Sequence, residues 1–350
     1  MKKLNLIHLG IGRVGKALVR QITKQREEVE KKYDVRLNYC GLFVSDKGLL
    51  NPKGLTLEQF IHFPQIWNVN NAYEAVVATP SPFILIDTTA SEETYPLLLS
   101  ALKKGEWVVL SNKKPISGSQ KRFDLLHKFG GRKILYETTV GAALPVISTL
   151  RNLIATGDDI MEIKGCFSGT LGFLFSQLET GLMFSQAVAQ AMKKGYTEPD
   201  PRDDLSGVDV ARKALILARI TGQKKELADV ALASLYPKTM DKYNINHFLQ
   251  KITQLDGLYT KKFREAKRKN KTLRFVATIA QAKSTVDLEA VNKASDLDSL
   301  AGPDNIIIFK TKRYFDYPLV IKGPGAGIEV TASGVFAEIL TIVKMISFTT

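Results

Sequence analysis

The chain has 350 residues, of which 45% are hydrophobic and 24% charged, and a formal net charge of +14. This length suits about two domains, and the composition excludes a disordered chain. No apolar run approaches the ~20 residues that span a bilayer, so we expect no membrane partner. Two cysteines, Cys40 and Cys166, and four scattered histidines predict neither a disulfide framework nor a zinc site, and favour the reducing cytoplasm.

The amino-terminal segment has the pattern that opens a dinucleotide-binding βαβ unit. An apolar run at residues 4–9 leads into the string GIGRVG at residues 10–15, and a helical pattern follows. The first glycine permits a tight turn, the second lets a pyrophosphate approach the backbone, and the third packs the helix against the strand. The helix's amino end favours negative charge. The pattern predicts a nicotinamide or flavin dinucleotide.

A second buried strand is predicted at residues 37–44, followed by Ser45, Asp46 and Lys47. In this fold the end of that strand meets the adenosine ribose, where an acidic residue favours NAD and a basic one accommodates the 2′-phosphate of NADP. Asp46 favours NAD, whereas Lys47 and Arg13 favour NADP and Ser45 adds a hydroxyl. Because two cations and a hydroxyl can bind a phosphate dianion better than one carboxylate can repel it, we favour NADP as the cofactor. NAD stays open as the alternative.

Further strands are predicted at residues 83–87, 107–110 and 133–136. Small polar residues follow the first two, and ligands of open α/β sheets bind outside the carboxyl ends of the strands. Lys113 lies in the second of these turns, where it could contact a substrate carbonyl or a phosphate. The alternative interpretation is a solvated loop cation.

A polar, turn-rich segment at residues 194–207 leads directly into a helix predicted from residue 208. Asp209 and Lys213 are spaced i and i+4, so they share one face of that helix. A surface ion pair of this kind would contribute only ~0.3–0.5 kcal/mol. Apolar neighbours leave little room for a solvated face, so the pair suits a general acid held by a carboxylate.

The densest positive charge lies at residues 261–274, KKFREAKRKNKTLR. Such a run could contact a polyanion, or it could be the solvated face of a helix followed by a loop. No nucleic-acid module or interleaved aromatic residues accompany it, so we expect no nucleic-acid partner.

Long strings along nearly the whole chain resemble homoserine dehydrogenase. The string GYTEPDPRDDL at residues 195–205, followed by DVARK at residues 209–213, is peculiar to that family. Beside GIGRVG, the other matching strings are DTTAS (87–91), SNKKP (111–115), ETTVGAALPVISTLRNLIATGD (137–158), FSGTL (167–171) and GPGAGIEVTASGVFAEIL (323–340).

The resemblance implies the reversible NAD(P)H-dependent reduction of L-aspartate 4-semialdehyde to L-homoserine, a step of threonine and methionine biosynthesis. It also implies roles: Lys213 as proton donor, Asp209 orienting the reacting end of the substrate, Glu198 holding its amino group, and Lys113 contacting both cofactor and substrate. The implied substrate-binding residues are Glu198, Asp204, Asp209 and Thr170. The predicted cofactor contacts are Gly10, Gly12, Arg13, Val14, Gly15, Ser45, Lys47, Thr89, Lys113, Gly195 and Gly325. A structural monovalent cation such as Na⁺ is implied at Glu137, Val140, Ala142 and Leu144, mostly through backbone carbonyls.

The implied fold is α/β, with a Rossmann-type nucleotide-binding domain at residues 1–137 and 318–350. An α+β catalytic and dimerisation domain with an open mixed sheet occupies residues 138–317, with strands at 160–167, 273–282, 285–291 and 305–310. The resemblance also implies a homodimer and a short, monofunctional form without a regulatory ACT domain. The stretch Phe173-Leu174-Phe175 is more apolar than the family's usual tyrosine-containing version, which predicts altered packing beneath the substrate.

Alternatives from other classes stay open. An aspartate-semialdehyde dehydrogenase needs a nucleophilic cysteine, but Cys166 lies in an apolar strand pattern that predicts an inert, buried thiol. A non-catalytic dinucleotide-sensing protein would keep the glycine turn without a reason to keep Glu198, Asp209 and Lys213 together. Two further alternatives remain. The protein could be another amino-acid semialdehyde reductase, or a polyanion-binding scaffold that uses residues 261–274.

Overall fold

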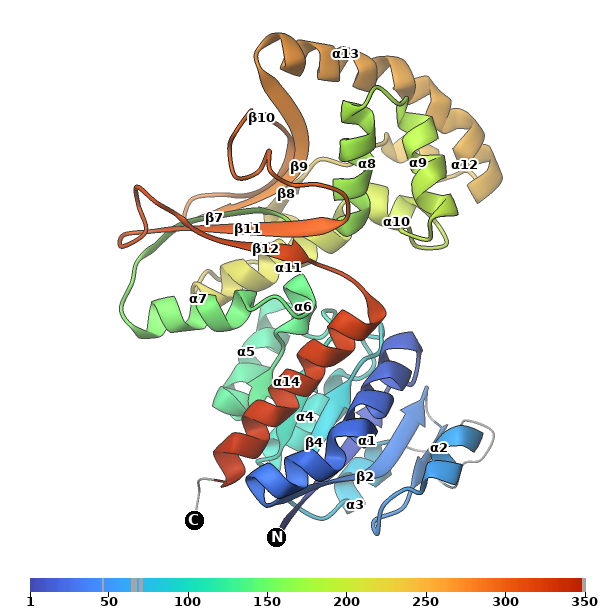
Figure 1. Ribbon diagram of the computed structural model, residues 1–350, viewed down its shortest axis with the longest axis vertical. Coiled ribbons are helices and arrows are strands. Elements are labelled where there is room, and N and C mark those ends of the chain that lie inside the picture. The colour runs from blue at the N-terminus through green and yellow to red at the C-terminus, as the bar shows by residue number, and fades with distance from the viewer. Residues whose placement is uncertain (46, 64–67, 69–71, 348–350) are drawn as a thin grey trace. The chain divides into compact units, whose positions relative to one another are not determined.

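The computed structural model describes residues 1–45, 47–63, 68 and 72–347. The chain forms two compact units: unit 1, made of Met1–Ala143 and Gly327–Thr350, and unit 2, made of Leu144–Ala326. Each unit builds its own six-stranded sheet, and the elements are labelled in Figure 1.

Unit 1 contains strands β1 (Lys2–Leu9), β2 (Val35–Val44), β3 (Lys47–Leu50), β4 (Phe83–Asp87), β5 (Trp107–Leu110) and β6 (Ile134–Leu135). Its helices are α1 (Arg13–Tyr33), α2 (Leu57–His62), α3 (Ala72–Ala78), α4 (Tyr95–Lys103), α5 (Gln120–Gly130), η1 (Gly131–Lys133), α6 (Thr138–Gly141) and α14 (Ile328–Ser347).

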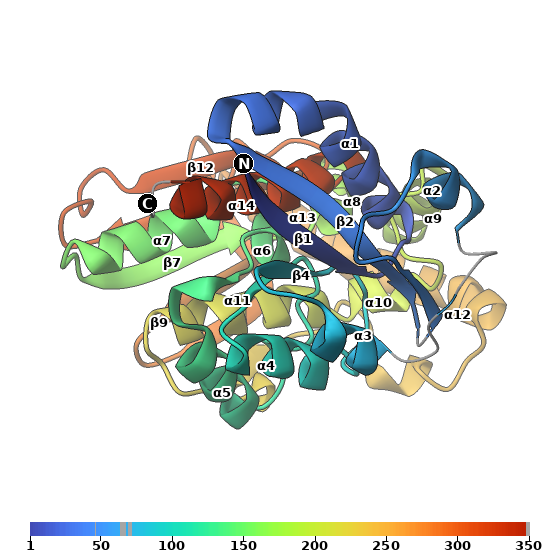
Figure 2. The ribbon, with the colours of Figure 1, turned by 90° about the horizontal axis from the view of Figure 1, so that it is seen from below.

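The sheet of unit 1 has the order β3-β2-β1-β4-β5-β6, and only β3 runs antiparallel to its neighbour. Figure 2 shows α1 and α14 on one face of this sheet and α3, α4 and α5 on the other. Strands β4 and β5 are buried along their whole length, as expected for parallel strands covered on both faces. The predicted Rossmann-type α/β fold is confirmed. The sequence did not predict β3: the chain turns at Ser45 (φ 51°), so that Lys47 pairs with Val44.

Among the described residues, helix α14 alone is long and apolar enough, by length and composition, to cross a membrane. The expectation that no apolar run approaches this length is therefore wrong. The helix packs along α1, and Val335, Ile339 and Ile342 are fully buried in the core of unit 1. The apolar composition of α14 is thus explained by its place in that core.

Unit 2 contains strands β7 (Ile160–Cys166), β8 (Val230–Leu232), β9 (Lys271–Ala280), β10 (Ser284–Asn292), β11 (Asp304–Thr311) and β12 (Leu319–Pro324). Its helices are α7 (Val146–Ala155), α8 (Gly169–Glu179), α9 (Phe184–Lys193), α10 (Arg202–Leu205), α11 (Val208–Ile220), η2 (Leu227–Asp229), η3 (Lys238–Met240), α12 (Ile245–Lys251), η4 (Ile252–Leu255) and α13 (Asp256–Arg268).

The sheet of unit 2 is mixed, in the order β12-β11-β7-β9-β10-β8, with β8 parallel to β10 and the other neighbours antiparallel. Its two faces differ. The cross-strand row of Phe309, Ile163 and Ile279 is buried, whereas the adjacent row, which includes Ile308 and Lys164, is only half-buried. The short strands β8 and β12 were not predicted: both are partly exposed, so they lack the continuous apolar run of the buried strands β4 and β5.

The boundaries between the units lie at 143/144 and 326/327, rather than at the expected 137/138 and 317/318. Helix α6 contacts α14 within unit 1, which keeps residues up to 143 in that unit. Strand β12 pairs with β11, which keeps residues 319–324 in unit 2.

The basic run at residues 261–274 is only partly a solvated helix face. Residues 261–268 end α13 and are mostly exposed, but residues 271–274 belong to β9. Arg274 is 3% exposed and donates hydrogen bonds to Glu179 at 3.2 Å and to the carbonyls of Leu297 and Asp298. The expectation of a helix followed by a loop is therefore wrong for the end of this run.

Candidate functional site

The glycine turn lies between β1 and α1, and steric contacts explain two of its glycines. Gly10 has φ +90°, and a Cβ atom there would lie 2.7 Å from the backbone nitrogen of Thr89. A Cβ at Gly15 would lie 2.3 Å from the carbonyl oxygen of Gly10. By contrast, apart from Gly12 itself, its chain neighbours and the backbone of its own helix, no atom of the described chain lies within 4 Å of a Cβ built at Gly12, so the backbone there is open to a ligand.

Helix α1 begins directly after this open glycine. Gly12 is its N-cap residue and supplies no side-chain hydrogen bond. A helix that begins without a capping side chain offers its first N–H groups to an external acceptor, and its dipole favours an anion there. Arg13 and Val14 form the first turn, and Arg13 is exposed. This end of α1 can therefore hold the pyrophosphate of a dinucleotide.

A chain of three hydrogen bonds ties the glycine turn to the centre of the sheet. The Thr88 hydroxyl donates to the Gly10 carbonyl at 2.6 Å, so its oxygen accepts from His8 Nε2 at 2.9 Å. The opposite ring nitrogen, His8 Nδ1, then accepts from the Tyr39 hydroxyl at 3.2 Å. Burial lowers the pKa of His8 to about 3, so the imidazole is neutral and its tautomer is fixed by these partners. We name these three side chains the Tyr39–His8–Thr88 relay. The sequence analysis, which found the four histidines scattered, did not predict this chain of hydrogen bonds.

Asp87, at the carboxyl end of β4, joins the two loops that follow β4 and β5. Its carboxylate accepts from the Thr89 N–H at 2.9 Å, the Thr94 hydroxyl at 2.7 Å and the Asn112 amide at 3.0 Å. Burial raises the pKa of Asp87, and these hydrogen bonds oppose the shift. Thr89 and the half-buried Lys113, which follows Asn112, are thus both placed at this edge of the sheet.

The predicted ribose position lies at the turn after β2. Ser45 and Lys47 are exposed there, on either side of Asp46. Asp46 itself lies outside the described residues. The two cations predicted to favour NADP, Arg13 and Lys47, both belong to unit 1.

In unit 2 the predicted Asp209–Lys213 pair forms on the first turns of α11. Lys213 is 9% exposed; its ammonium lies 2.9 Å from Asp209 Oδ2 and donates to the Phe167 carbonyl at 2.7 Å. Gly207 precedes the helix with φ +73°, and a Cβ there would lie 2.8 Å from the Phe275 ring. This ammonium is held by a carboxylate and a carbonyl in a largely desolvated place, so it differs from an ordinary surface ion pair.

Three more predicted substrate residues gather around this pair. The Glu198 N–H donates to Asp204 Oδ2 at 2.8 Å, and the Thr170 hydroxyl donates to the Tyr196 carbonyl. Burial raises the pKa of Asp204, and the charges of Glu198 and Asp209 raise it further, while hydrogen bonds from Glu198 and Thr170 oppose the shift. This negative cluster fits a ligand with an ammonium group. In the described part of the chain, no three His, Cys, Asp or Glu side chains are arranged to hold a metal ion.

Arg202, which the sequence analysis did not single out, fixes the acidic loop. Its guanidinium binds Asp200 with Nε at 2.9 Å and also donates to the carbonyls of Asp241 and Tyr243. Gly195, one of the predicted cofactor contacts, is exposed with φ +69° at the start of the same loop. A long-range arginine clamp of this kind leaves no local pattern in the sequence.

The apolar Phe173-Leu174-Phe175 stretch is buried in α8. The Phe173 ring packs edge-on against Tyr196, with 4.9 Å between ring centroids. The stretch therefore supports the loop whose Tyr196 carbonyl accepts from Thr170.

Asn305 is a second residue that the sequence analysis missed. It is fully buried, and within the described part of the chain neither its side-chain oxygen nor its nitrogen has a hydrogen-bond partner. A Cβ at Gly325 would lie 1.8 Å from Asn305 Cγ, so only glycine fits there. Gly325, a predicted cofactor contact, thus has a packing role inside unit 2.

The implied cation ligands are carbonyl donors of suitable chemistry. Glu137, Val140 and Ala142 lie on and around the single turn of α6 in unit 1, and Leu144 begins unit 2. Carbonyls at the end of a helix have no intrahelical partner and carry partial negative charge. Val140 and Ala142 lie toward the carboxyl end of this turn, whereas the carbonyls of Glu137 and Leu144 already accept hydrogen bonds from the N–H groups of Val140 and Val146.

Neither cysteine fits a nucleophile. Cys166 is 4% exposed, and burial raises the pKa of its thiol to about 12. Burial likewise raises the pKa of Cys40 to about 11. Both thiols are protonated near neutral pH, which disfavours a thiol-dependent semialdehyde dehydrogenase.

Comparison with known proteins places these features in one family. Residues 145–340 match the family model of homoserine dehydrogenase, and residues 10–137 match that of the homoserine dehydrogenase NAD-binding domain. The bifunctional aspartokinase/homoserine dehydrogenase 1 of Zea mays is 38% identical over 353 residues, which cover 95% of this chain but 38% of that protein. The chain thus spans well under half the length of that curated relative.

Two solved structures have the same fold. A protein of unknown function from Candida auris superposes with a TM-score of 0.89 at 30% identity, covering 98% of this chain and 99% of that one. A hyperthermophilic archaeal homoserine dehydrogenase in complex with NADPH superposes with a TM-score of 0.74 at 24% identity, covering 99% and 98%. From the match over more than half of its length, the chain belongs to the homoserine dehydrogenase family.

Proposed function

We propose that this protein catalyses the NAD(P)H-dependent reduction of L-aspartate 4-semialdehyde to L-homoserine. The observation that carries the proposal is the largely buried Lys213 ammonium, bound to Asp209 beside the acidic cluster of Glu198 and Asp204. Bound NAD(P)H supplies the hydride. As negative charge builds on the aldehyde oxygen, Lys213 stabilises it and donates the proton.

The acidic cluster gives the substrate its orientation. The ammonium group of the amino acid is attracted by Glu198 and Asp204, which leaves the aldehyde end for Asp209 and Lys213. Thr170 helps to hold Asp204 and the backbone of Tyr196 in place. Lys113, at the sheet edge of unit 1, is the second cation assigned to cofactor and substrate.

We assign NADP as the preferred cofactor. Arg13 at the start of α1 and Lys47 after β2 can neutralise a 2′-phosphate, and the Ser45 hydroxyl can donate to it. The NADPH carried by the archaeal enzyme of the same fold agrees with this assignment. Tight ground-state binding does not by itself speed hydride transfer, so binding and turnover need separate measurement.

The test is the absorbance change of the nicotinamide with L-homoserine at alkaline pH, with NAD⁺ and NADP⁺ run side by side. Turnover with either cofactor supports the proposed reaction, and a higher kcat/KM with NADP⁺ supports the cofactor assignment. A matched Lys47→Gln variant should lower the NADP⁺ preference without changing NAD⁺ turnover. No turnover with either cofactor, in a folded protein that binds a dinucleotide, favours a sensing protein or a different semialdehyde.

A homodimer, a structural monovalent cation and a cytoplasmic location also stay proposals. The half-buried sheet face of unit 2, with Ile308 and Lys164, suits contact with a second copy, and its edge strands β8 and β12 could pair further. Light scattering across a dilution series measures the dimer. Loss of thermal stability on replacing Na⁺ with a large organic cation measures the ion at α6.

A further inference from the structure

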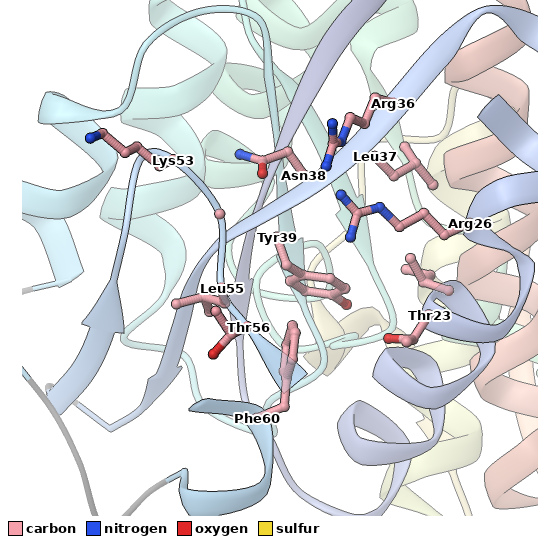
Figure 3. Close-up of a pocket in the computed structure, with 12 residues that line it drawn as sticks. Thr23, Arg26, Arg36, Leu37, Asn38, Tyr39, Lys53, Leu55, Thr56 and Phe60 are labelled. Atoms are coloured by element: carbon pink, nitrogen blue, oxygen red, sulfur yellow. The ribbon is translucent and has the colours of Figure 1, made fainter. Parts of the chain in front are cut away.

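A cavity of about 340 Å³ lies in unit 1 between α1, the first half of β2 and the segment after β3. Figure 3 shows the side chains that line it. Its floor is aromatic: Tyr39 is buried, and its ring meets Phe60 edge-on with 5.5 Å between centroids. The volume falls at the small end of the ~300–1,000 Å³ usual for ligand pockets.

Three cations line this cavity. Arg26 comes from α1, Arg36 from the start of β2 and Lys53 from the segment after β3. Figure 3 shows the guanidinium groups of Arg26 and Arg36 extending toward each other above the Tyr39 ring. The two arginines also border a second, shallower hollow with Glu27 and Glu30. Within the described chain, no carboxylate oxygen lies within 4 Å of either guanidinium. Two converging guanidinium groups repel each other unless an anion lies between them.

The cavity is separate from the predicted dinucleotide site. Dinucleotides bind outside the carboxyl ends of the strands, which for β2 is Val44. Arg36 is the second residue of β2, so it lies about 26 Å from Val44 along the strand, at roughly 3.3 Å per residue. The cations of the cavity therefore do not serve the 2′-phosphate position at Ser45 and Lys47.

We propose that this cavity binds a small organic anion, with a phosphate or carboxylate between Arg26 and Arg36 and an apolar body on Tyr39 and Phe60. Guanidinium groups bind such oxyanions in a bidentate geometry, and the aromatic floor favours a planar, apolar body. The Thr56 hydroxyl and Lys53, at the rim, complete the polar lining. Tyr39 also begins the hydrogen-bond relay to the glycine turn, so the ligand contacts a residue linked to the cofactor loop.

The probe is phenyl phosphate, titrated by isothermal calorimetry into protein saturated with NADPH, so that the dinucleotide site is already filled. We expect binding that persists in the presence of NADPH. Arg26→Gln and Arg36→Gln should each weaken it about tenfold or more, since each removes a charged hydrogen-bond donor to the anion. Lys24→Gln is the control, because Lys24 is exposed on the same helix and does not line the cavity.

Several outcomes overturn the proposal. Binding that disappears with NADPH places the probe in the dinucleotide site, and equal weakening in Lys24→Gln indicates diffuse attraction to a basic surface. Inorganic phosphate binding as tightly as phenyl phosphate would remove the organic body from the proposal. If no probe binds, the arginines only balance Glu27 and Glu30.

Benzoate in place of phenyl phosphate decides between a carboxylate and a phosphate ligand. Circular dichroism of each variant confirms that it is folded.

Discussion

The polar groups near the glycine turn of unit 1 and those near Lys213 of unit 2 are held in different ways. Tyr39, His8 and Thr88 are joined by hydrogen bonds between uncharged groups. Lys213, Asp209 and their acidic neighbours are held largely by charge. The difference suits the roles that we propose for the two regions. A turn that receives a permanent anion needs fixed neutral dipoles, whereas a site where charge develops during the reaction benefits from a full opposite charge.

The largest expected effect tests the charged side of this comparison. Lys213→Ala should lower turnover by roughly 10²–10⁴-fold, because the proton donor and the charge opposite the developing alkoxide are both lost. Steady-state kinetics with homoserine measure this, and Lys224→Ala, an exposed lysine, is the control. Turnover close to that of the parent protein would remove Lys213 from its assigned role.

Next in size is a purely structural ion-pair network of unit 2. Arg274→Met leaves Glu179 and Asp298 without their buried guanidinium and should lower the free energy of unfolding by about 3 kcal/mol. Urea titration measures the loss.

The same network predicts a pH dependence. Burial opposes ionisation of Glu179, but hydrogen bonds from Lys293 and Arg274 outweigh it and lower its pKa below 4.5. The stabilisation is therefore present above about pH 4.5 and disappears as the pH falls through the lowered pKa. In Arg274→Met this loss of stability on acidification should be smaller than in the parent protein. If the loss is the same in both proteins, the network does not have the proposed role.

The uncharged Tyr39–His8–Thr88 relay should begin to lose stability at a higher pH than the Glu179 network as the solution is acidified. His8 has its pKa lowered from 6.5 to about 3 by burial, so below pH 6.5 the unfolded chain takes up a proton that the folded chain does not. Stability should fall by ~1.4 kcal/mol per pH unit from this residue as the pH drops from 6.5 toward 3.

His8→Gln isolates that contribution. The variant should be less stable than the parent at pH 7.5 by ~1–2 kcal/mol, because it disturbs the relay, and the gap should close toward pH 5. Thermal unfolding across the pH series measures both. The KM for NAD(P)⁺ should also rise with the KM for homoserine unchanged, since Thr88 holds Gly10. A gap that stays constant with pH would mean that His8 is not buried in the neutral form.

The smallest expected effect compares the two units directly, because each holds one buried cysteine. Cys40 and Cys166 have raised pKa values of about 11 and about 12. Reaction with a disulfide reagent at pH 8 should be at least ~100-fold slower than that of a free thiol. Cys40→Ala and Cys166→Ala separate the two rates, and the faster one identifies the unit that opens more often. Rapid reaction of Cys166 would reopen the thiol-dependent alternative.

Features that depend on nearby residues were predictable. Continuous apolar runs gave β4 and β5 with their observed bounds, and the i,i+4 spacing anticipated the contact between Asp209 and Lys213. The long acidic string indicated a turn-rich segment before α11, because prolines and glycines mark turns by their own backbone preferences, but it did not predict that residues 202–205 form the short helix α10.

Features that depend on distant partners were not predictable. The His8 ring meets a hydroxyl 80 residues away, and Arg274 meets a carboxylate 95 residues away. Separations of this length do not follow the repeat of a helix or a strand, so no local pattern reveals them. A histidine or arginine looks the same in the sequence whether its side chain is paired or solvated. Strand β3 was missed for a related reason: its existence depends on the left-handed backbone of Ser45 more than on its own four residues.

Helix α14 has a consequence for biosynthesis. The ribosome makes residues 1–143 first, then the whole of residues 144–326, and only then the helix that completes the core of unit 1 beside α1. During translation, the second unit can therefore finish folding while the first still exposes the apolar surface that α14 will cover. We therefore expect nascent unit 1 to be more prone to aggregation than unit 2 until α14 leaves the exit tunnel, since exposed apolar surface promotes aggregation.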